Sequence, residues 1–149
     1  MGIPNLNKLM TDKASKYINK IHLKELNDKT ICIDTSIYLY KFIGQNKLIE
    51  NFYNMLSLFR YYNIHAIFIF DGKPPEEKKE LLNKRKMDKK EAETKYKELQ
   101  IELNNTSLSI ELKNEYNVEM EKLRKQFIRI KKYHVQDVKT LIMIFGQSY

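Results

Sequence analysis

Residues 64–85 read IHAIFIFDGKPPEEKKELLNKR, and this stretch determines how the rest of the chain is organised. Its first seven residues are mostly β-branched or aromatic, which predicts a short strand buried on both faces. The run ends at Asp71, where Gly72 permits a sharp turn and a proline at position 74 or 75 suits the first turn of a helix. A polar helix rich in Lys and Arg follows. The stretch therefore places a carboxylate at the carboxyl end of a strand, where open α/β sheets bind their ligands.

The composition indicates a folded protein with a polyanionic partner. Of the 149 residues 42% are hydrophobic, and the formal net charge of +8 favours nucleic acid first and an acidic membrane surface second. The apolar runs are too short to span a bilayer, so no membrane-spanning segment is expected. The single cysteine, Cys32, excludes an internal disulfide and a cysteine-based zinc site, and it favours a reducing, intracellular compartment.

A second strand with the same ending precedes the first one along the chain. Residues 30–33, TICI, predict a short buried strand that leads into Asp34, and Thr35 and Ser36 are candidates for capping the helix that follows. Residues 48–62 predict a stronger helix, because their apolar side chains recur at spacings of four, four and three. Strand, helices and strand in this order form a crossover that pairs the strands in parallel. We therefore expect both strand-ending aspartates at the same edge of one sheet.

The pattern over residues 76–133 predicts a helical hairpin inserted between strands of the sheet. Its first part, to about residue 103, is charged nearly all round, which is typical of a helix that crosses solvent. Residues 104–107, NNTS, predict a turn, and apolar side chains then recur at helical spacing from 112 to 130. A compact apolar helix is expected over residues 135–145.

The two strand-ending aspartates are candidate ligands for Mg²⁺. Hard cations prefer carboxylate oxygens, and Mg²⁺ is usually held by one or two carboxylates together with waters and phosphate oxygens. The alternative is that Asp34 and Asp71 only form turns, because aspartate is common where strands end. Spacing alone leaves both interpretations open.

A basic helix face and one tyrosine are the candidate contacts for nucleic acid. Lys78, Arg85 and Lys89 are separated by seven and four residues, so they are predicted to share one helix face that phosphates beside the sheet edge would meet. The alternative is a solvated helix with Glu–Lys pairs, and residues 84–90 also fit a nuclear localisation patch. Tyr40 is either a stacking platform for a base or a half-buried packing residue.

Four segments of the chain resemble the flap endonuclease/XPG family of structure-specific 5′ nucleases. The family opens on a segment similar to MGIPNLNKLM (residues 1–10), and its first acidic strand and next helix resemble ICIDTSIYLYKF (residues 31–42). Its second acidic strand and the start of its helical arch resemble FIFDGKPPEEKKELLNKR (residues 68–85). The helix before its Glu-x-Glu strand resembles VQDVKTLIMIFGQSY (residues 135–149). The resemblance implies an α/β fold: a PIN-like parallel sheet flanked by helices, with a helical-arch hairpin inserted at about residues 76–133.

The resemblance also implies a role for each of the matching catalytic positions. Asp34 and Asp71 match two of the carboxylates of the family's metal site. Lys78 and Arg85 match the basic pair that reaches from the arch toward the scissile phosphate, where it would offset negative charge. The implied reaction is Mg²⁺-dependent hydrolysis of DNA phosphodiester bonds in replication or repair.

Further matching positions imply contacts with the DNA itself. Gly2 matches the glycine whose freed amino end lies close to the active site, and Tyr40 matches the tyrosine that stacks on a base near the cut. Lys89 and Lys90, together with Lys78 and Arg85, would bind the DNA from the arch. The implied substrate is DNA with a 5′ flap or a junction between single strand and duplex. The implied location is the nucleus of a eukaryote, or the host cell of a virus.

The sequence departs from the family pattern in two places. The connection between Tyr40 and Phe52 is shorter than the family's loop that wedges the duplex, so the preference for flaps is less determined than the nuclease class. The sequence ends at Tyr149, where the family would supply its paired glutamates and later aspartates. We therefore interpret residues 1–149 as the N-terminal portion of a nuclease domain whose C-terminal part is absent. The two-metal site is expected only with the missing acids.

Two other interpretations fit the sequence. One is a DNA-binding module of the same fold without catalysis, because the remaining acids are absent. The other is a coiled-coil interaction protein built around residues 76–133. Metal-dependent cleavage separates the nuclease from the first, and strands ending at Asp34 and Asp71 separate it from the second.

We predict that these 149 residues alone bind DNA weakly, in a salt-sensitive manner, and hardly cut it. Two closely spaced Mg²⁺ ions repel one another, so Asp34 and Asp71 need further protein carboxylates to hold both. A Mg²⁺ titration of the purified chain on a 5′-flap DNA tests this, with Asp34→Asn as the control for a contaminating nuclease. Robust cleavage that disappears in the control would show that the missing acids are dispensable.

Overall fold

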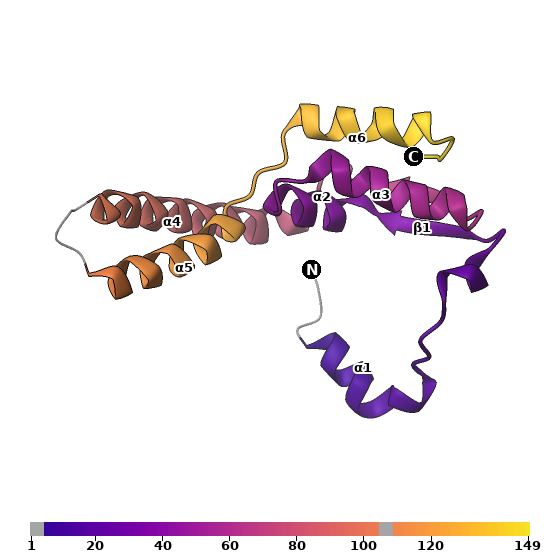
Figure 1. Cartoon of the computed structure of the whole chain (residues 1–149), viewed down its shortest axis with the longest axis horizontal. Helices are drawn as coiled ribbons and strands as arrows, with labels where there is room; N and C mark the ends of the chain where they lie inside the picture. The colour runs from indigo at the N-terminus through magenta and orange to yellow at the C-terminus, as the bar shows by residue number, and fades with distance from the viewer. Residues whose placement is uncertain (1–4, 105–108) are drawn as a thin grey trace.

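Two parallel strands form the centre of the computed structural model, which describes residues 5–104 and 109–149 (Figure 1). Strand β1 (Thr30–Asp34) pairs in parallel with β2 (His65–Ile69), in a register that runs from Thr30 opposite His65 to Asp34 opposite Ile69. Ser148 adds an isolated parallel bridge to Ile67 of β2. The predicted crossover is therefore confirmed, and both strands end at the same edge of the sheet.

Three helices pack with the strands to form the main core. They are α2 (Thr35–Gly44), α3 (Leu48–Tyr61) and α6 (Lys132–Ile144). The predicted apolar stripe of α3 is confirmed, because Phe52, Leu56 and Phe59 are all buried. They join Phe68 of β2 and Val138 of α6 in one hydrophobic cluster. Burial of this stripe against the sheet and α6 is what fixes α3, in line with the hydrophobic effect as the main stabilising term.

Among the described residues, helices cover the sheet on one face only. This corrects the prediction that the strand before Asp71, which is β2, is buried on both of its faces. Ala66 and Phe68 of β2 are buried, whereas His65 and Ile69 on the other face are exposed. The exposure follows from the arrangement of the helices, because α3 and α6 lie on the same side of the sheet (Figure 1). The alternation of buried and exposed residues is that of a sheet with one solvated face.

The N-terminal part of the described chain stands away from this core. Helix α1 (Leu6–Ala14) has no buried residue, and Figure 1 shows it on the side of the sheet opposite α3 and α6. Residues 5–104 also contain three short 3₁₀ segments: η1 (Ser15–Tyr17), η2 (Leu23–Leu26) and η3 (Glu76–Lys78). Among the described residues, no helix is long and apolar enough to cross a membrane.

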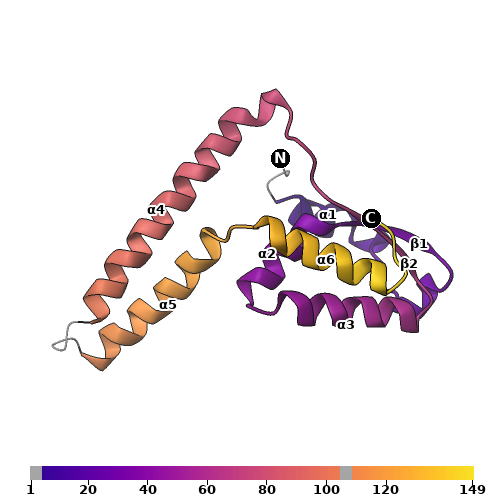
Figure 2. The same cartoon turned by 90° about the horizontal axis from the view of Figure 1, so that it is seen from above.

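A long helical hairpin projects from the core (Figure 2). It consists of α4 (Lys79–Leu103) and α5 (Ile110–Gln126), and it follows β2 and precedes α6 in the chain. Its helices bury a second, smaller cluster around Ala92, Leu99 and Leu123. The prediction of a charged helix crossing solvent is therefore correct for most of α4 but missed the narrow apolar face that packs on α5. The sheet and the main core also exclude the interpretation that the chain is only a coiled coil.

The hairpin also carries an ion pair between its two helices. Lys95 of α4 lies 2.6 Å from Glu119 of α5, and this contact raises the pKa of the Lys95 ammonium. Because the pKa is raised, the pair stabilises the folded state fully at pH values below the ordinary lysine pKa. This stabilisation is lost as the pH rises through the pKa of the folded state. Because both side chains are exposed, the pair is a minor contribution beside the apolar contacts.

We predict that the two clusters are separately stable units. The substitution Leu123→Ala should destabilise the hairpin by about 2–5 kcal/mol. The substitution Phe52→Ala should destabilise the main core by about 3–5 kcal/mol. Native-state hydrogen exchange measures this: Leu123→Ala should accelerate exchange in α4 and α5 while the amides of β1 and β2 stay protected. Uniform acceleration along the whole chain in the Leu123→Ala variant would show that the structure unfolds as one unit.

Candidate metal and nucleic-acid site

One serine connects the two predicted metal ligands. The backbone N–H of Ser36 donates a hydrogen bond to Asp34 Oδ1 at 3.0 Å, and the Ser36 hydroxyl donates to Asp71 Oδ2 at 2.6 Å. Asp71 lies two residues beyond the end of β2, so the parallel pairing and the first turn of α2 together bring the carboxylates to one place. The structure thus joins, through a single residue, two aspartates that are 37 positions apart in the sequence.

The helix cap at this edge differs from the prediction. Asp34 itself is the N-cap of α2, and Thr35 and Ser36 form the first turn of the helix. Asp34 has the extended backbone of a cap residue, so its side chain reaches the N–H of Ser36. A carboxylate at this position also interacts favourably with the positive end of the helix dipole. Asp34 therefore ends the strand and begins the helix.

The donor set at this edge suits a hard cation. Asp34 and Asp71 are both exposed and supply carboxylate oxygens, which Mg²⁺ prefers, while leaving room for water and phosphate oxygens. In the part of the chain that the structure describes, no group of three or more His, Cys, Asp or Glu side chains lies close enough to hold a metal ion. The described residues thus provide a pair of carboxylates at this edge of the sheet.

A basic cavity lies between α2 and the hairpin. Its volume is about 410 Å³, and its lining residues are Tyr40, Leu82, Arg85, Lys86, Lys89 and Arg129. Tyr40 is 43% exposed, and Lys89 Nζ lies 4.9 Å from the centroid of its ring. An aromatic face surrounded by cations is the combination that single-stranded nucleic acids favour.

The remaining predicted contacts are more dispersed. Lys78 is half-buried; it is the last residue of η3 and the N-cap of α4. Arg85 and Lys89 line the same cavity, and Lys78 is not among its lining residues. Lys90 is exposed and lines a neighbouring hollow of about 340 Å³. Gly2 lies outside the described residues, so its predicted position near the site stays a prediction.

Sequence reasoning missed two residues of this region. Ser36 was predicted only as a possible cap, and its second hydrogen bond depends on the strand register, which the sequence indicates less directly. Arg129 comes from the segment between α5 and α6 and belongs to no periodic motif. The cluster of Lys and Arg in α4 was the one available signal for a basic cavity, and it does not indicate which distant residue completes the lining.

Comparison with known proteins identifies one family over most of the chain. The sequence profile described as the XPG N-terminal domain matches residues 1–92. A probable RAD2-like endonuclease, 369L, of Invertebrate iridescent virus 6 is 32% identical over 130 residues, which cover 77% of this chain and 31% of that protein. A probable RAD2-like endonuclease, 076L, of Invertebrate iridescent virus 3 is 39% identical over 90 residues, covering 58% of this chain and 23% of that protein.

Cellular proteins show the same similarity over a longer stretch. Flap endonuclease 1 of Anoplopoma fimbria is 29% identical over 165 aligned positions, which cover all of this chain and 40% of that protein. The chain therefore spans less than half of the length of each of these three relatives.

We predict that Ser36→Ala weakens divalent-cation binding at the carboxylate pair by about fivefold, because removing a hydrogen bond of about 1 kcal/mol leaves Asp71 less fixed. Mn²⁺ titration followed by paramagnetic broadening of the resonances around Asp34 and Asp71 measures the change. The matched control is Thr35→Val, which removes the neighbouring hydroxyl; that hydroxyl is buried and has no hydrogen-bond partner among the described residues. Equal weakening of cation binding in both variants would mean that binding depends on the first turn of α2 as a whole and not on the hydrogen bond from Ser36 to Asp71.

Proposed function

Because the chain belongs to the XPG N-terminal domain family, we propose that it is the N-terminal part of a structure-specific 5′ nuclease that hydrolyses DNA phosphodiester bonds with Mg²⁺. The observation that carries the proposal is the pair Asp34 and Asp71, held through Ser36 at the carboxyl ends of two parallel strands. The names of the viral and cellular relatives, which are endonucleases, support the same reaction class.

The carboxylate pair has the chemistry to hold the catalytic cation. Asp34 and Asp71 would hold Mg²⁺ through their exposed oxygens, and Ser36 keeps Asp71 in place by its hydroxyl. Bound Mg²⁺ would supply an activated water and stabilise the leaving oxygen of the phosphodiester. Residues of the nuclease beyond those described would add carboxylates for a second cation.

The basic residues would act on the DNA and not on the cation. We assign Lys78 and Arg85 to the scissile phosphate, where their charge would offset the charge that develops during hydrolysis. Tyr40 would stack on a base, which its 43% exposure permits. Lys89 and Lys90 would add attraction for the DNA backbone, and Gly2 would lie close to the reacting end. The hairpin of α4 and α5 would serve as the arch, inserted at about residues 76–133 of the nuclease domain.

The proposed substrate is DNA with a 5′ flap or a junction between single strand and duplex. The cavity between α2 and α4 supports a single-stranded element, because it combines one accessible aromatic ring with several cations. The proposed setting is DNA replication or repair, in the nucleus of a eukaryotic cell or in the host cell of a virus. A DNA-binding module of the same fold without catalysis is the alternative that the following variants separate.

We predict that Asp34→Asn or Asp71→Asn lowers single-turnover cleavage of a 5′-flap DNA by about 100-fold or more and leaves DNA affinity largely intact. Asparagine keeps the shape of the side chain but removes a charged oxygen ligand, and the loss of metal stabilisation amounts to several kcal/mol. Rapid-quench kinetics of the complete gene product at saturating Mg²⁺ measures the rate. Wild-type rates in both variants would rule out these residues as ligands, and absence of cleavage in every form, with DNA binding retained, would favour the non-catalytic module.

We predict a different result for the basic residues. Lys78→Ala and Arg85→Ala should each reduce the single-turnover rate by about 10²–10³ with a much smaller change in affinity, because they act on charge that develops in the transition state. Lys90→Ala should mainly weaken binding and lessen its dependence on salt. If all three substitutions weakened affinity to the same extent without a separate effect on the rate, the hairpin would be a general DNA clamp.

A further inference from the structure

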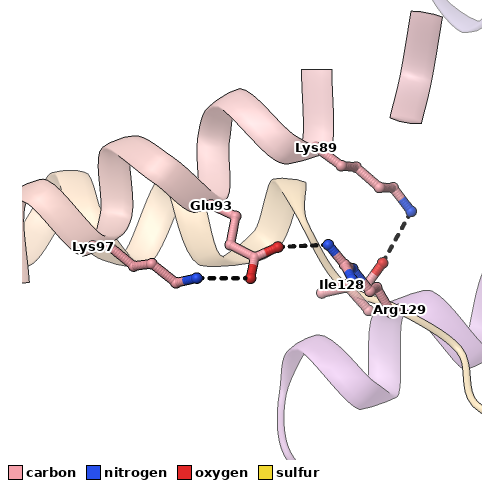
Figure 3. Close-up of polar contacts among 5 residues, drawn as sticks. All are labelled: Lys89, Glu93, Lys97, Ile128 and Arg129. Carbon is pink, nitrogen blue, oxygen red and sulfur yellow. Dashed lines mark hydrogen bonds and ion pairs between the residues drawn. The ribbon is translucent and has the colours of Figure 1, made fainter. Parts of the chain in front are cut away.

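A single ammonium group connects three elements at the base of the hairpin. Lys89, on α4, donates a hydrogen bond from Nζ to the backbone carbonyl of Ile128 at 2.9 Å (Figure 3). The same Nζ lies 4.9 Å from the ring centroid of Tyr40 on α2. Ile128 belongs to the short segment between α5 and α6, so Lys89 joins the outgoing helix, the returning segment and the core helix.

A second contact holds the adjacent residue of the returning segment. Arg129 Nη2 donates to Glu93 Oε2 at 2.5 Å, and Lys97 lies 3.3 Å from the other oxygen of Glu93 (Figure 3). Lys89 and Glu93 are four residues apart, so they are neighbours on one face of α4. Two successive turns of α4 therefore hold two successive residues of the segment that returns to the core.

The returning segment is also seated against α2. A Cβ atom at Gly44 would lie 2.8 Å from Cδ1 of Ile128, which is closer than packed atoms approach. Ile128 therefore occupies space that is free because residue 44 has no side chain. The carbonyl that Lys89 binds is thus itself placed on α2, four residues along the helix from Tyr40.

The two contacts differ in their exposure to solvent. The Arg129 side chain is 64% exposed, so its ion pair with Glu93 is screened by water and salt. The bond from Lys89 to Ile128 is partly buried, and a charged donor to a carbonyl makes a stronger hydrogen bond than a neutral one. Lys89 is therefore the less screened of the two attachments.

From these contacts we infer that Lys89 is a positioning residue, which fixes the hairpin against α2 and sets the orientation of the Tyr40 ring. The inference rests on the proposed function in one respect: the orientation would present Tyr40 and the basic face of α4 to one DNA strand. It separates Lys89 from its neighbour Lys90, which carries the same charge but is exposed on the hollow beside it. The two lysines form a natural matched pair.

The test measures hairpin orientation directly in the 149-residue chain. Spin labels are attached to Cys32, the single cysteine of the sequence and exposed on β1, and to a second cysteine introduced as Gln100→Cys, which replaces an exposed residue on the far part of α4. In this background, Lys89→Met should broaden the distance distribution about twofold, because removing the attachment frees the hairpin base. Lys90→Met should leave the distribution unchanged.

A conservative variant distinguishes a positioning role from a general effect on folding. Lys89→Arg should keep the narrow distribution, because a guanidinium also donates to carbonyls and stacks on aromatic rings. Far-UV circular dichroism and the melting temperature verify that each variant is folded, and Lys89→Gln, which is neutral but polar, replaces Lys89→Met if the latter is misfolded. A distribution that stays narrow without Lys89, that broadens equally in Lys90→Met, or that broadens in Lys89→Arg overturns the inference.

The measurement needs neither DNA nor cleavage, so its outcome is independent of the proposed nuclease activity. Binding of a fluorescent single-stranded DNA as a function of salt then gives a second readout. Lys89→Met and Lys90→Met each remove one positive charge and should lower the salt slope by similar amounts, about 0.7 for each phosphate that is no longer neutralised. A narrow distribution that disappears in Lys89→Met alone, beside equal salt slopes, supports the positioning role. Intact orientation in that variant, whatever the salt slopes, contradicts it.

Discussion

Parallel pairing between β1 and β2 is the constraint on which the candidate metal site depends. Because parallel strands end at the same edge, the pairing places Asp34 opposite Ile69, two residues before Asp71. The crossover through α2 and α3 is what makes the strands parallel. Ser36 then fixes the two carboxylates relative to each other by its N–H and its hydroxyl. A shift of one residue in the register would move every side chain of the strand to the opposite face.

The features that the sequence predicts well are those with a strong local signal. The apolar spacing of α3 and the strand runs before Asp34 and Asp71 follow directly from residue type, and the parallel crossover follows from the order of elements. Burial on both faces of β2 was predicted wrongly, because a run of Ile and Phe looks the same whether one or two layers of helices cover it. The position of a covering layer is a tertiary property that the run itself does not contain.

The cavity between the core and the hairpin is a second case of this limit. Arg85 and Lys89 were expected on one face because helical spacing determines it, but the contribution of Arg129 depends on how a segment about forty residues later returns to the core. Lys78 lies in the 3₁₀ segment between the proline-containing turn and α4, and the different periodicity of that segment means that α-helical spacing alone does not fix its position relative to Arg85. Contacts made by long-range packing are therefore read from the structure and not from spacing.

The close approach of Ile128 to Gly44 has a mechanical consequence. Ile128 is also the residue whose carbonyl Lys89 binds, and residues 90–103 of α4 extend beyond that attachment for roughly 21 Å at 1.5 Å per residue. A rotation of about 5° at this attachment would displace the far end of α4 by roughly 2 Å, which is about the H···O distance of one hydrogen bond. A methyl group added at Gly44 beside Ile128 would thus displace the far end of α4 more than the residues near the substitution.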